Sequence, residues 1–209
     1  MDEQPVVFLV SDKSKTRRQL AARLKQLGYE AQAFCSIEEF QQRSLATGAG
    51  CLLLGLSHPD VDLDWLQKAG PLEDHWPVVA VAADADVETA VNAMKRGVFD
   101  FLLESCSDRR MAAAIDEAFR WDALQRRRIA TVQSIRRRMK QLTPALHDVL
   151  DLLLKGKGNR EIAVELGLSE RSIEDRRAKL MRTMKARSLA ALVRQSLLAE
   201  GATTGRPTQ

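Results

Sequence analysis

The chain of 209 residues contains few cysteines and no long apolar segment. Its three cysteines, Cys35, Cys51 and Cys106, are odd in number and lack the spacing of a metal site. This pattern argues against a disulfide framework and favours reduced, buried thiols. No segment approaches the roughly 20 apolar residues of a membrane-spanning helix, and the acidic start argues against a secretory signal. We therefore expect a cytoplasmic protein that does not associate with a membrane.

Proline and glycine are both absent from residues 108–141, a stretch of 34 residues. Such a stretch predicts one continuous helix roughly 50 Å long. Its first part should pack on the preceding domain as the last helix of that domain, and its second part should lead into the next domain. The absence of helix-breaking residues thus predicts a long linker helix that joins two domains.

Charge is distributed unevenly along the chain. Residues 1–107 carry 10 Lys and Arg against 16 Asp and Glu, a net charge of −6. Residues 108–142 carry 10 against 4, and residues 143–209 carry 12 against 8, so these parts have net charges of +6 and +4. An acidic front half and a basic back half indicate that the back half meets nucleic acid.

Residues 156–184 have the pattern of two short helices around a tight turn. Asn159 is a favoured N-cap residue for the first helix, Gly167 should end it with a positive φ, and Ser169 should cap the second helix. The second helix has an apolar stripe, which consists of Ile173, Leu180, Met181 and Met184. Its opposite side carries Arg171, Glu174, Asp175, Ala178 and Arg182. This is the pattern of a helix-turn-helix whose second helix lies in a groove of DNA.

The same region resembles the LuxR-type helix-turn-helix domain of FixJ/NarL-class response regulators. The matching residues are Leu142-Thr143-Pro144, Val149-Leu150, Gly156, Asn159, Glu161-Ile162-Ala163, Leu166-Gly167-Leu168-Ser169, Ala186-Arg187-Ser188 and Leu192-Val193. The chain departs from the family pattern at Ala145-Leu146, which are usually charged, and at Arg176, which is usually histidine. The resemblance implies an all-α four-helix domain that binds a two-fold related operator as a dimer.

Within this domain the second helix supplies most of the predicted DNA contacts. Glu174, Asp175 and Ala178 should face base edges, because a carboxylate accepts from cytosine N4 and alanine contacts a thymine methyl group. Adjacent helical residues diverge by about 100°, so Arg176 or Arg177 must point partly inward. The predicted phosphate contacts are Arg171, Arg176, Arg177, Lys179 and Arg182, and Asn159 and Ser172 complete the DNA-binding set.

Residues 5–103 alternate apolar runs with amphipathic stretches about five times. The predicted strands are 5–10, 29–34, 51–56, 77–82 and 98–103. The predicted helices between them are 13–27, 37–45, 63–68 and 86–96. Short loops and strand–helix alternation predict a five-stranded parallel sheet with helices on both faces.

This front half resembles the receiver domain of response regulators, which has a flavodoxin-like strand order. The resemblance rests on Val10-Ser11-Asp12, Pro59-Asp60, residues 90–97 and Phe99-Asp100-Phe101. Phosphoryl acceptance in the family requires an aspartate, further acids that hold Mg²⁺, a hydroxyl and a lysine. Here these positions fall on a degenerate set, namely Gly55 for the acceptor, Ser11 and Asp12 for the acids, Ala82 for the hydroxyl and Glu104 for the lysine. The resemblance therefore implies a pseudo-receiver that is not phosphorylated.

Two acidic groups remain to be explained in this half. Asp12 and Glu104 should both point at the altered site, where they share a proton, bind a cation weakly or pair with Lys13. The run Asp60-x-Asp62-x-Asp64 lacks the glycine and the later glutamate of an EF-hand, so we interpret it as a capped helix start. We predict no metal site and no cofactor.

Two apolar stripes are candidate dimer contacts. Ile129, Val132, Ile135 and Met139 are spaced closely enough to a heptad seam for a short coiled coil. The final helix, predicted at 188–199, has a second stripe that consists of Leu189, Leu192, Val193 and Leu197. The flanking arginines, 126–128 and 136–138, belong either to a solvated linker helix or to a phosphate-binding surface.

These patterns together predict a DNA-binding transcription regulator that is not an enzyme. We expect a pseudo-receiver over 1–107, a linker helix over 108–141, the DNA-binding domain over 142–200 and a disordered tail over 201–209. The expected partners are double-stranded DNA, a second copy of the chain, and a protein or small-molecule effector that replaces phosphorylation. The alternative is a protein-interaction adaptor with weak or lost DNA binding.

Overall fold

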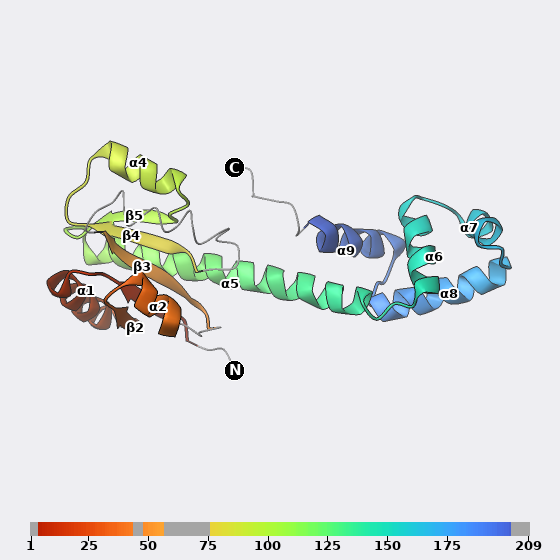
Figure 1. Ribbon diagram of the computed structural model, residues 1–209, viewed down its shortest axis with the longest axis horizontal. Coiled ribbons are helices and arrows are strands. Elements are labelled where there is room, and N and C mark those ends of the chain that lie inside the picture. The colour runs from red at the N-terminus through yellow and green to blue at the C-terminus, as the bar shows by residue number, and fades with distance from the viewer. Residues whose placement is uncertain (1–3, 44–47, 57–75, 202–209) are drawn as a thin grey trace. The chain divides into compact units, whose positions relative to one another are not determined.

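The computed structural model describes residues 4–43, 48–56 and 76–201 (Figure 1). The chain divides into two compact units, Met1–Arg126 and Arg127–Gln209. Helix α5, Asp108–Met139, contributes its first part to one unit and its last part to the other. The division thus falls inside the segment predicted as a linker, and the second part of α5 belongs to the second unit.

The first unit contains a five-stranded parallel sheet with the order β2-β1-β3-β4-β5, which is the flavodoxin-like arrangement. The strands are β1 (Val6–Val10), β2 (Glu30–Phe34), β3 (Gly50–Leu56), β4 (Val78–Ala82) and β5 (Asp100–Leu103). Every residue of β3 and β4 is buried, as expected for central strands covered on both faces. The predicted fold class is confirmed.

Helices cover both faces of this sheet. Helix α1 (Ser14–Gln26) and α5 pack on one face, where Leu24, Leu53 and Ile115 belong to one core. Helices α2 (Ile37–Arg43) and α4 (Val87–Lys95) pack on the other face, where Phe40, Leu54 and Ala93 belong to a second core (Figure 1). The predicted helix at 63–68 and the run Asp60 to Asp64 lie outside the described residues.

A buried carboxylate fixes α5 to the sheet of the first unit. Asp122 is only 3% exposed, and its Oδ2 accepts a hydrogen bond of 3.0 Å from the backbone N–H of Gly50 at the start of β3. The same carboxylate accepts from Arg126 Nε at 2.8 Å, and the Arg126 guanidinium lies 5.9 Å from the Trp76 ring centroid. This cluster fixes the turn of α5 that contains Asp122 and Arg126 to the amino end of the sheet.

The second unit packs four helices and the end of α5 around one core. The helices are α6 (Pro144–Leu154), α7 (Asn159–Leu166), α8 (Glu170–Met184) and α9 (Leu189–Gly201). Leu150, Ile162, Ile173 and Leu180 are almost fully buried at its centre, and Ile135 of α5 joins them. The four-helix prediction is therefore confirmed, with α5 contributing to the same core.

Several local predictions need correction. Gly158, not Asn159, is the N-cap of α7, because Gly158 has extended dihedral angles and Asn159 is already helical. Helix α9 includes Gly201, so the predicted tail begins later, and residues 202–209 lie outside the described residues. Of the three free cysteines only Cys51 is buried, where desolvation raises the pKa of its thiol, whereas Cys35 is exposed. In the described part of the chain, no helix is long and apolar enough to span a membrane.

Candidate nucleic-acid interface and receiver-like pocket

Helix α8 is fixed at its amino end and along one side. Gly167 adopts a left-handed conformation with φ of 65° and ends α7, and Ser169 Oγ then caps α8 by accepting from the Ser172 N–H at 3.2 Å. Ile173, Leu180 and Met184 are each 0% exposed on its inner side. The sequence-based prediction of the turn, the cap and the apolar stripe is confirmed.

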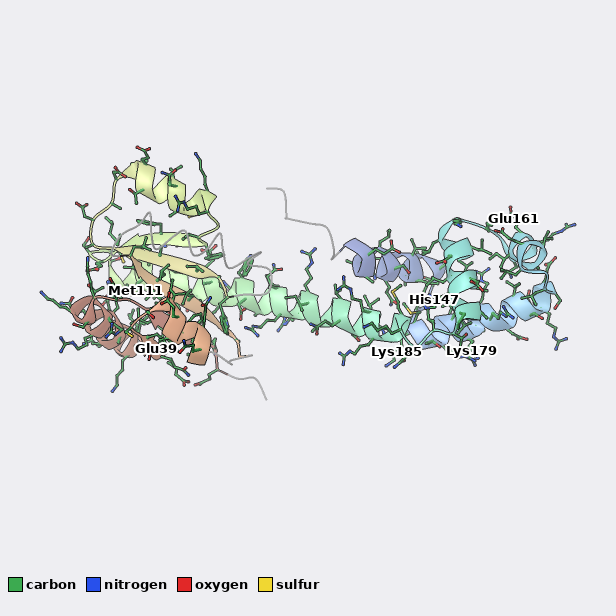
Figure 2. The ribbon with its side chains drawn as sticks, viewed as in Figure 1. Glu39, Met111, His147, Glu161, Lys179 and Lys185 are labelled. Atoms are coloured by element: carbon green, nitrogen blue, oxygen red, sulfur yellow. The ribbon has the colours of Figure 1, made fainter. Side chains whose placement is uncertain are left out.

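The opposite side of α8 is accessible. All five residues predicted for this side are exposed, namely Arg171, Glu174, Asp175, Ala178 and Arg182. Lys179 beside them is also exposed (Figure 2). Arg176 is half-buried, and Ser172 is half-buried with its hydroxyl 2.9 Å from Ser169 Oγ. The arrangement offers several cations and two carboxylates on one helical surface.

Arg177 has a different environment from its neighbours on α8. Its Nη1 donates to Asn159 Oδ1 at the first turn of α7, so this guanidinium is directed toward α7. Asn159 and Arg177, both predicted to contact DNA, are therefore brought together with each other. The pair links the two helices of the helix-turn-helix. Of the adjacent arginines 176 and 177, Arg177 is therefore the one directed toward the protein.

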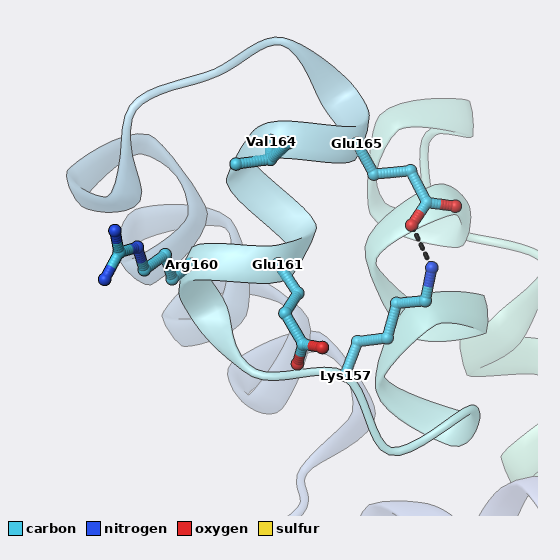
Figure 3. Close-up of a pocket in the computed structure, with 5 residues that line it drawn as sticks. All are labelled: Lys157, Arg160, Glu161, Val164 and Glu165. Carbon is cyan, nitrogen blue, oxygen red and sulfur yellow. Dashed lines mark hydrogen bonds and ion pairs between the residues drawn. The ribbon is translucent and has the colours of Figure 1, made fainter.

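A shallow surface hollow lies over α7 (Figure 3). Lys157, Arg160, Glu161, Val164 and Glu165 line it, and Lys157 forms an ion pair with Glu165. Glu161 Oε2 accepts from the Gly158 N–H at 2.8 Å, which satisfies one backbone donor at the start of α7. Lys157, Glu161 and Glu165 therefore serve the local structure of α7.

The chain is closely packed at the position where the family resemblance places the phosphoryl acceptor. Gly55 lies in β3 directly beside Ser11, which follows β1 and is 2% exposed. A Cβ atom added at Gly55 would lie 2.9 Å from Ser11 Cβ and 3.0 Å from Ser11 Oγ, which is closer than side chains normally approach. Glycine permits this close contact between the strands, and the serine side chain fills the adjacent space.

Two arginines of α1 contact the segments around this position, and the sequence did not single them out. Arg17 Nη1 donates to Ser11 O at 2.5 Å. Arg23 donates to Asp108 Oδ1 at 2.7 Å, to Glu104 O at 3.0 Å and to Cys106 O. Arg23 thus holds the connection between β5 and α5. This connection includes Glu104, which stands at the position that the resemblance assigns to the lysine.

The remaining groups of the predicted site differ in exposure, and the backbone N–H of Glu104 donates to Ala82 O at 2.8 Å. Ala82 is buried at the end of β4, Asp12 is exposed, and Glu104 is half-buried. Among the described ion pairs, none joins Lys13 to Glu104. Within the described ranges no group of three or more His, Cys, Asp or Glu side chains is arranged to hold a metal ion.

The predicted dimer stripes need correction, because several members are covered by their own chain. Ile135 and Leu192 are 2% and 0% exposed in the core of the second unit, and Met139 packs against that core. Val132 is also buried. Leu189 and Leu197 remain exposed at 40% and 60%, and Ile129 and Val193 are half-buried. Apolar residues three or four positions apart form an apolar face on a helix. This spacing does not distinguish a face that packs on a second chain from one that packs in the core of its own chain.

Two models of known protein families match the sequence of the chain. The model described as "Response regulator receiver domain" matches residues 7–116, more than half of the chain, and "Bacterial regulatory proteins, luxR family" matches residues 140–196. The chain belongs to the LuxR-type response regulators. Proteins of this class are DNA-binding transcription regulators rather than enzymes, and this chain is a regulator of the LuxR/FixJ type.

Relatives resemble this LuxR-type regulator over nearly its whole length. Nodulation protein W of Bradyrhizobium diazoefficiens is 32% identical over 192 residues, which cover 91% of this chain and 85% of the relative. Transcriptional regulatory protein FixJ of Azorhizobium caulinodans is 32% identical over 200 residues, 95% of each chain. The solved structure of response regulator StyR matches with a TM-score of 0.77 and 28% identity, covering 93% of this chain and 98% of the StyR chain.

Proposed function

We propose that this regulator reads DNA through α8 and does so without accepting a phosphoryl group. The observation that carries the proposal is the contact between Gly55 and Ser11. Glycine supplies no nucleophile at the acceptor position, and Ser11 Cβ lies only 2.9 Å from the point where a side chain at position 55 would begin. The receiver-like unit is then a pseudo-receiver whose degenerate site consists of Ser11, Asp12, Gly55, Ala82 and Glu104.

The exposed side of α8 supports the DNA-reading part of the proposal. Arg171, Arg176, Lys179 and Arg182 are assigned to phosphate contacts, which supply affinity because bound cations release counterions from DNA. Glu174, Asp175 and Ala178 are assigned to base edges, which supply sequence preference. Arg177 and Asn159 are assigned to holding α7 on α8, because they bond to each other.

A homodimer without a phosphorylation step is part of the same proposal. Leu189 and Leu197 of α9 are exposed and available to a second copy of the chain. A ligand shifts a conformational equilibrium only through its different affinities for the two states. Since Ala82 and Glu104 cannot make the usual contacts to a phosphoryl group, the sequence itself or another effector sets that equilibrium here.

A second candidate function is an adaptor in which the receiver-like unit binds protein and DNA contact is weak. The observation that favours it is the pair of exposed carboxylates on α8, Glu174 and Asp175, which repel phosphate. The two candidates differ in one measurable property, because only a DNA-reading regulator enriches particular sequences from a random pool.

The DNA-reading assignment is tested by comparing Glu174→Ala with Arg182→Ala in such a selection. Loss of a base-reading residue should change the preferred sequence by about 1–3 kcal/mol per base pair, whereas loss of a phosphate contact should weaken all sequences alike and lower the salt slope by about one. Identical preferred sites for wild type and Glu174→Ala would remove Glu174 from the reading side. Failure of the wild type to enrich any sequence would favour the adaptor.

The phosphorylation-independent assignment is tested by intact-mass measurement after incubation with acetyl phosphate and Mg²⁺. We expect no phosphoryl adduct on the wild type, because Gly55 has no side-chain oxygen. We also expect none on Gly55→Asp, because Ser11 Cβ obstructs the new side chain and Glu104 stands in place of the lysine. A base-labile adduct of one phosphoryl group on the wild type would contradict the pseudo-receiver.

A further inference from the structure

Two arginines in the last turn of α5 bind the carboxyl ends of two other helices. Arg136 Nε and Nη2 donate to Ala199 O in the last turn of α9, at 3.1 and 2.9 Å. Arg138 Nη1 donates to Met184 O, the last residue of α8, at 2.5 Å. Residues two apart diverge by about 200° around a helix, so the two side chains leave α5 on nearly opposite sides and reach different helices.

The end of α8 shows why this contact matters. Lys185 adopts a left-handed conformation with φ of 54°, and its N–H donates to Arg182 O at 3.1 Å. The N–H of Ala186 donates to Met181 O at 2.9 Å. These two bonds satisfy carbonyls one turn earlier, and Arg138 supplies a charged donor to Met184 O. A cation at this end also interacts favourably with the helix dipole.

We infer that Arg138 is a positioning residue for DNA reading, which holds the carboxyl end of α8 in place from outside the helix-turn-helix. The inference rests on the proposed function of α8. Three groups then fix α8 in the second unit: the buried stripe, the Arg177–Asn159 bond toward α7, and Arg138 at the carboxyl end. With Arg138 removed, α8 remains packed but its exposed side is held less accurately relative to the rest of the unit.

Arg137 provides a matched control on the same turn. It is exposed, and among the described residues no side-chain hydrogen bond or ion pair involves its guanidinium. Replacement of either arginine by methionine removes one positive charge and retains most of the aliphatic stem. The two variants therefore have the same net charge and differ in the bonds that Arg138 donates, to Met184 O and, from Nε at 3.2 Å, to Ser134 O within α5.

The test uses full-length wild type, Arg138→Met and Arg137→Met, and two duplexes. One duplex is the sequence that the wild type enriches from a random pool, and the other is a scrambled duplex of equal length. We expect Arg138→Met to bind the enriched duplex at least about tenfold more weakly, the scale of one charge-assisted hydrogen bond. Its affinity for the scrambled duplex should equal that of Arg137→Met, so only Arg138→Met loses discrimination.

Three outcomes would overturn the inference. Equal discrimination by Arg138→Met and Arg137→Met would show that the contact does not position α8. A parallel loss on both duplexes with a salt slope lower by about one would make Arg138 a phosphate contact instead. A wild type that enriches no sequence would remove the proposed function and the inference with it.

A second pair of variants keeps the test decisive if Arg138→Met does not fold. Arg138→Lys retains a charged donor but lacks the planar guanidinium, and Arg137→Lys is its control. All affinities are measured well below the thermal midpoints recorded by circular dichroism. Arg138→Lys should show discrimination between that of wild type and Arg138→Met, and below that of Arg137→Lys. Full discrimination by Arg138→Lys together with an unfolded Arg138→Met would reduce Arg138 to a stabilising residue.

Discussion

A fragment that begins at Arg127 is expected to fold and bind DNA by itself, whereas one that begins at Lys140 is expected to be largely unfolded. The shorter fragment lacks Val132 and Ile135, which are 7% and 2% exposed, and it lacks Arg136 and Arg138. Removal of a buried isoleucine side chain costs about 2–5 kcal/mol, and each bond from a charged donor adds about 1.5–3 kcal/mol. The total is comparable with the stability of a small domain.

Thermal and urea unfolding, followed by circular dichroism, measure this difference. A third fragment that begins at Asp122 serves as control, because it lengthens the chain by residues that belong to the first unit. Its unfolding midpoint should match that of the fragment beginning at Arg127. Equal midpoints for the fragments beginning at Arg127 and Lys140 would show that the end of α5 does not stabilise the second unit.

Asp122→Ala is expected to destabilise the first unit by about 1–3 kcal/mol, the scale for leaving a buried hydrogen-bond donor without its acceptor. The substitution leaves the Gly50 N–H without its acceptor in a buried position and removes the partner of Arg126 Nε. Movement of the backbone cannot readily restore the bond, because a Cβ at Gly50 would lie 2.3 Å from Val6 O, which shows how closely β1 and β3 approach there.

Urea unfolding of the full-length protein tests the role of Asp122, with Glu117→Ala as the matched control. Glu117 is an exposed acid on the same helix, so its loss changes net charge equally without removing a buried bond. Stabilities within about 1 kcal/mol of each other for the two variants would mean that the Asp122 cluster contributes little net free energy.

The sheet and the helix-turn-helix could be predicted from sequence because their signals are local. The continuous apolar run Leu52 to Leu54 marks a strand buried on both faces, and the stripe from Ile173 to Met184 repeats with the helical period. Turn residues such as Gly167 and caps such as Ser169 mark boundaries within one or two residues.

The long-range contacts that hold α5 and α8 in place could not be predicted in this way. Arg138 and Met184 lie 46 positions apart in the sequence, and Asp122 and Gly50 lie 72 apart, so no periodic pattern joins them. The spacing of Ile129 to Met139 predicted an apolar face but not its partner, which proved to be the core of the same unit for Ile135. Ser11 and Gly55 were both identified as altered, yet their direct contact follows only from the register of β1 and β3.

The division of α5 between two cores also determines where modules can be exchanged. A chimera that joins the second unit to a different sensing domain needs its joint at Arg126–Arg127, inside the helix. That joint leaves the Asp122–Arg126 pair with the sensing module and the Arg136 and Arg138 bonds with the DNA-binding module. The luxR-family match begins only at residue 140. A graft cut at that boundary would transfer the reading helix without the two arginines that close the ends of α8 and α9.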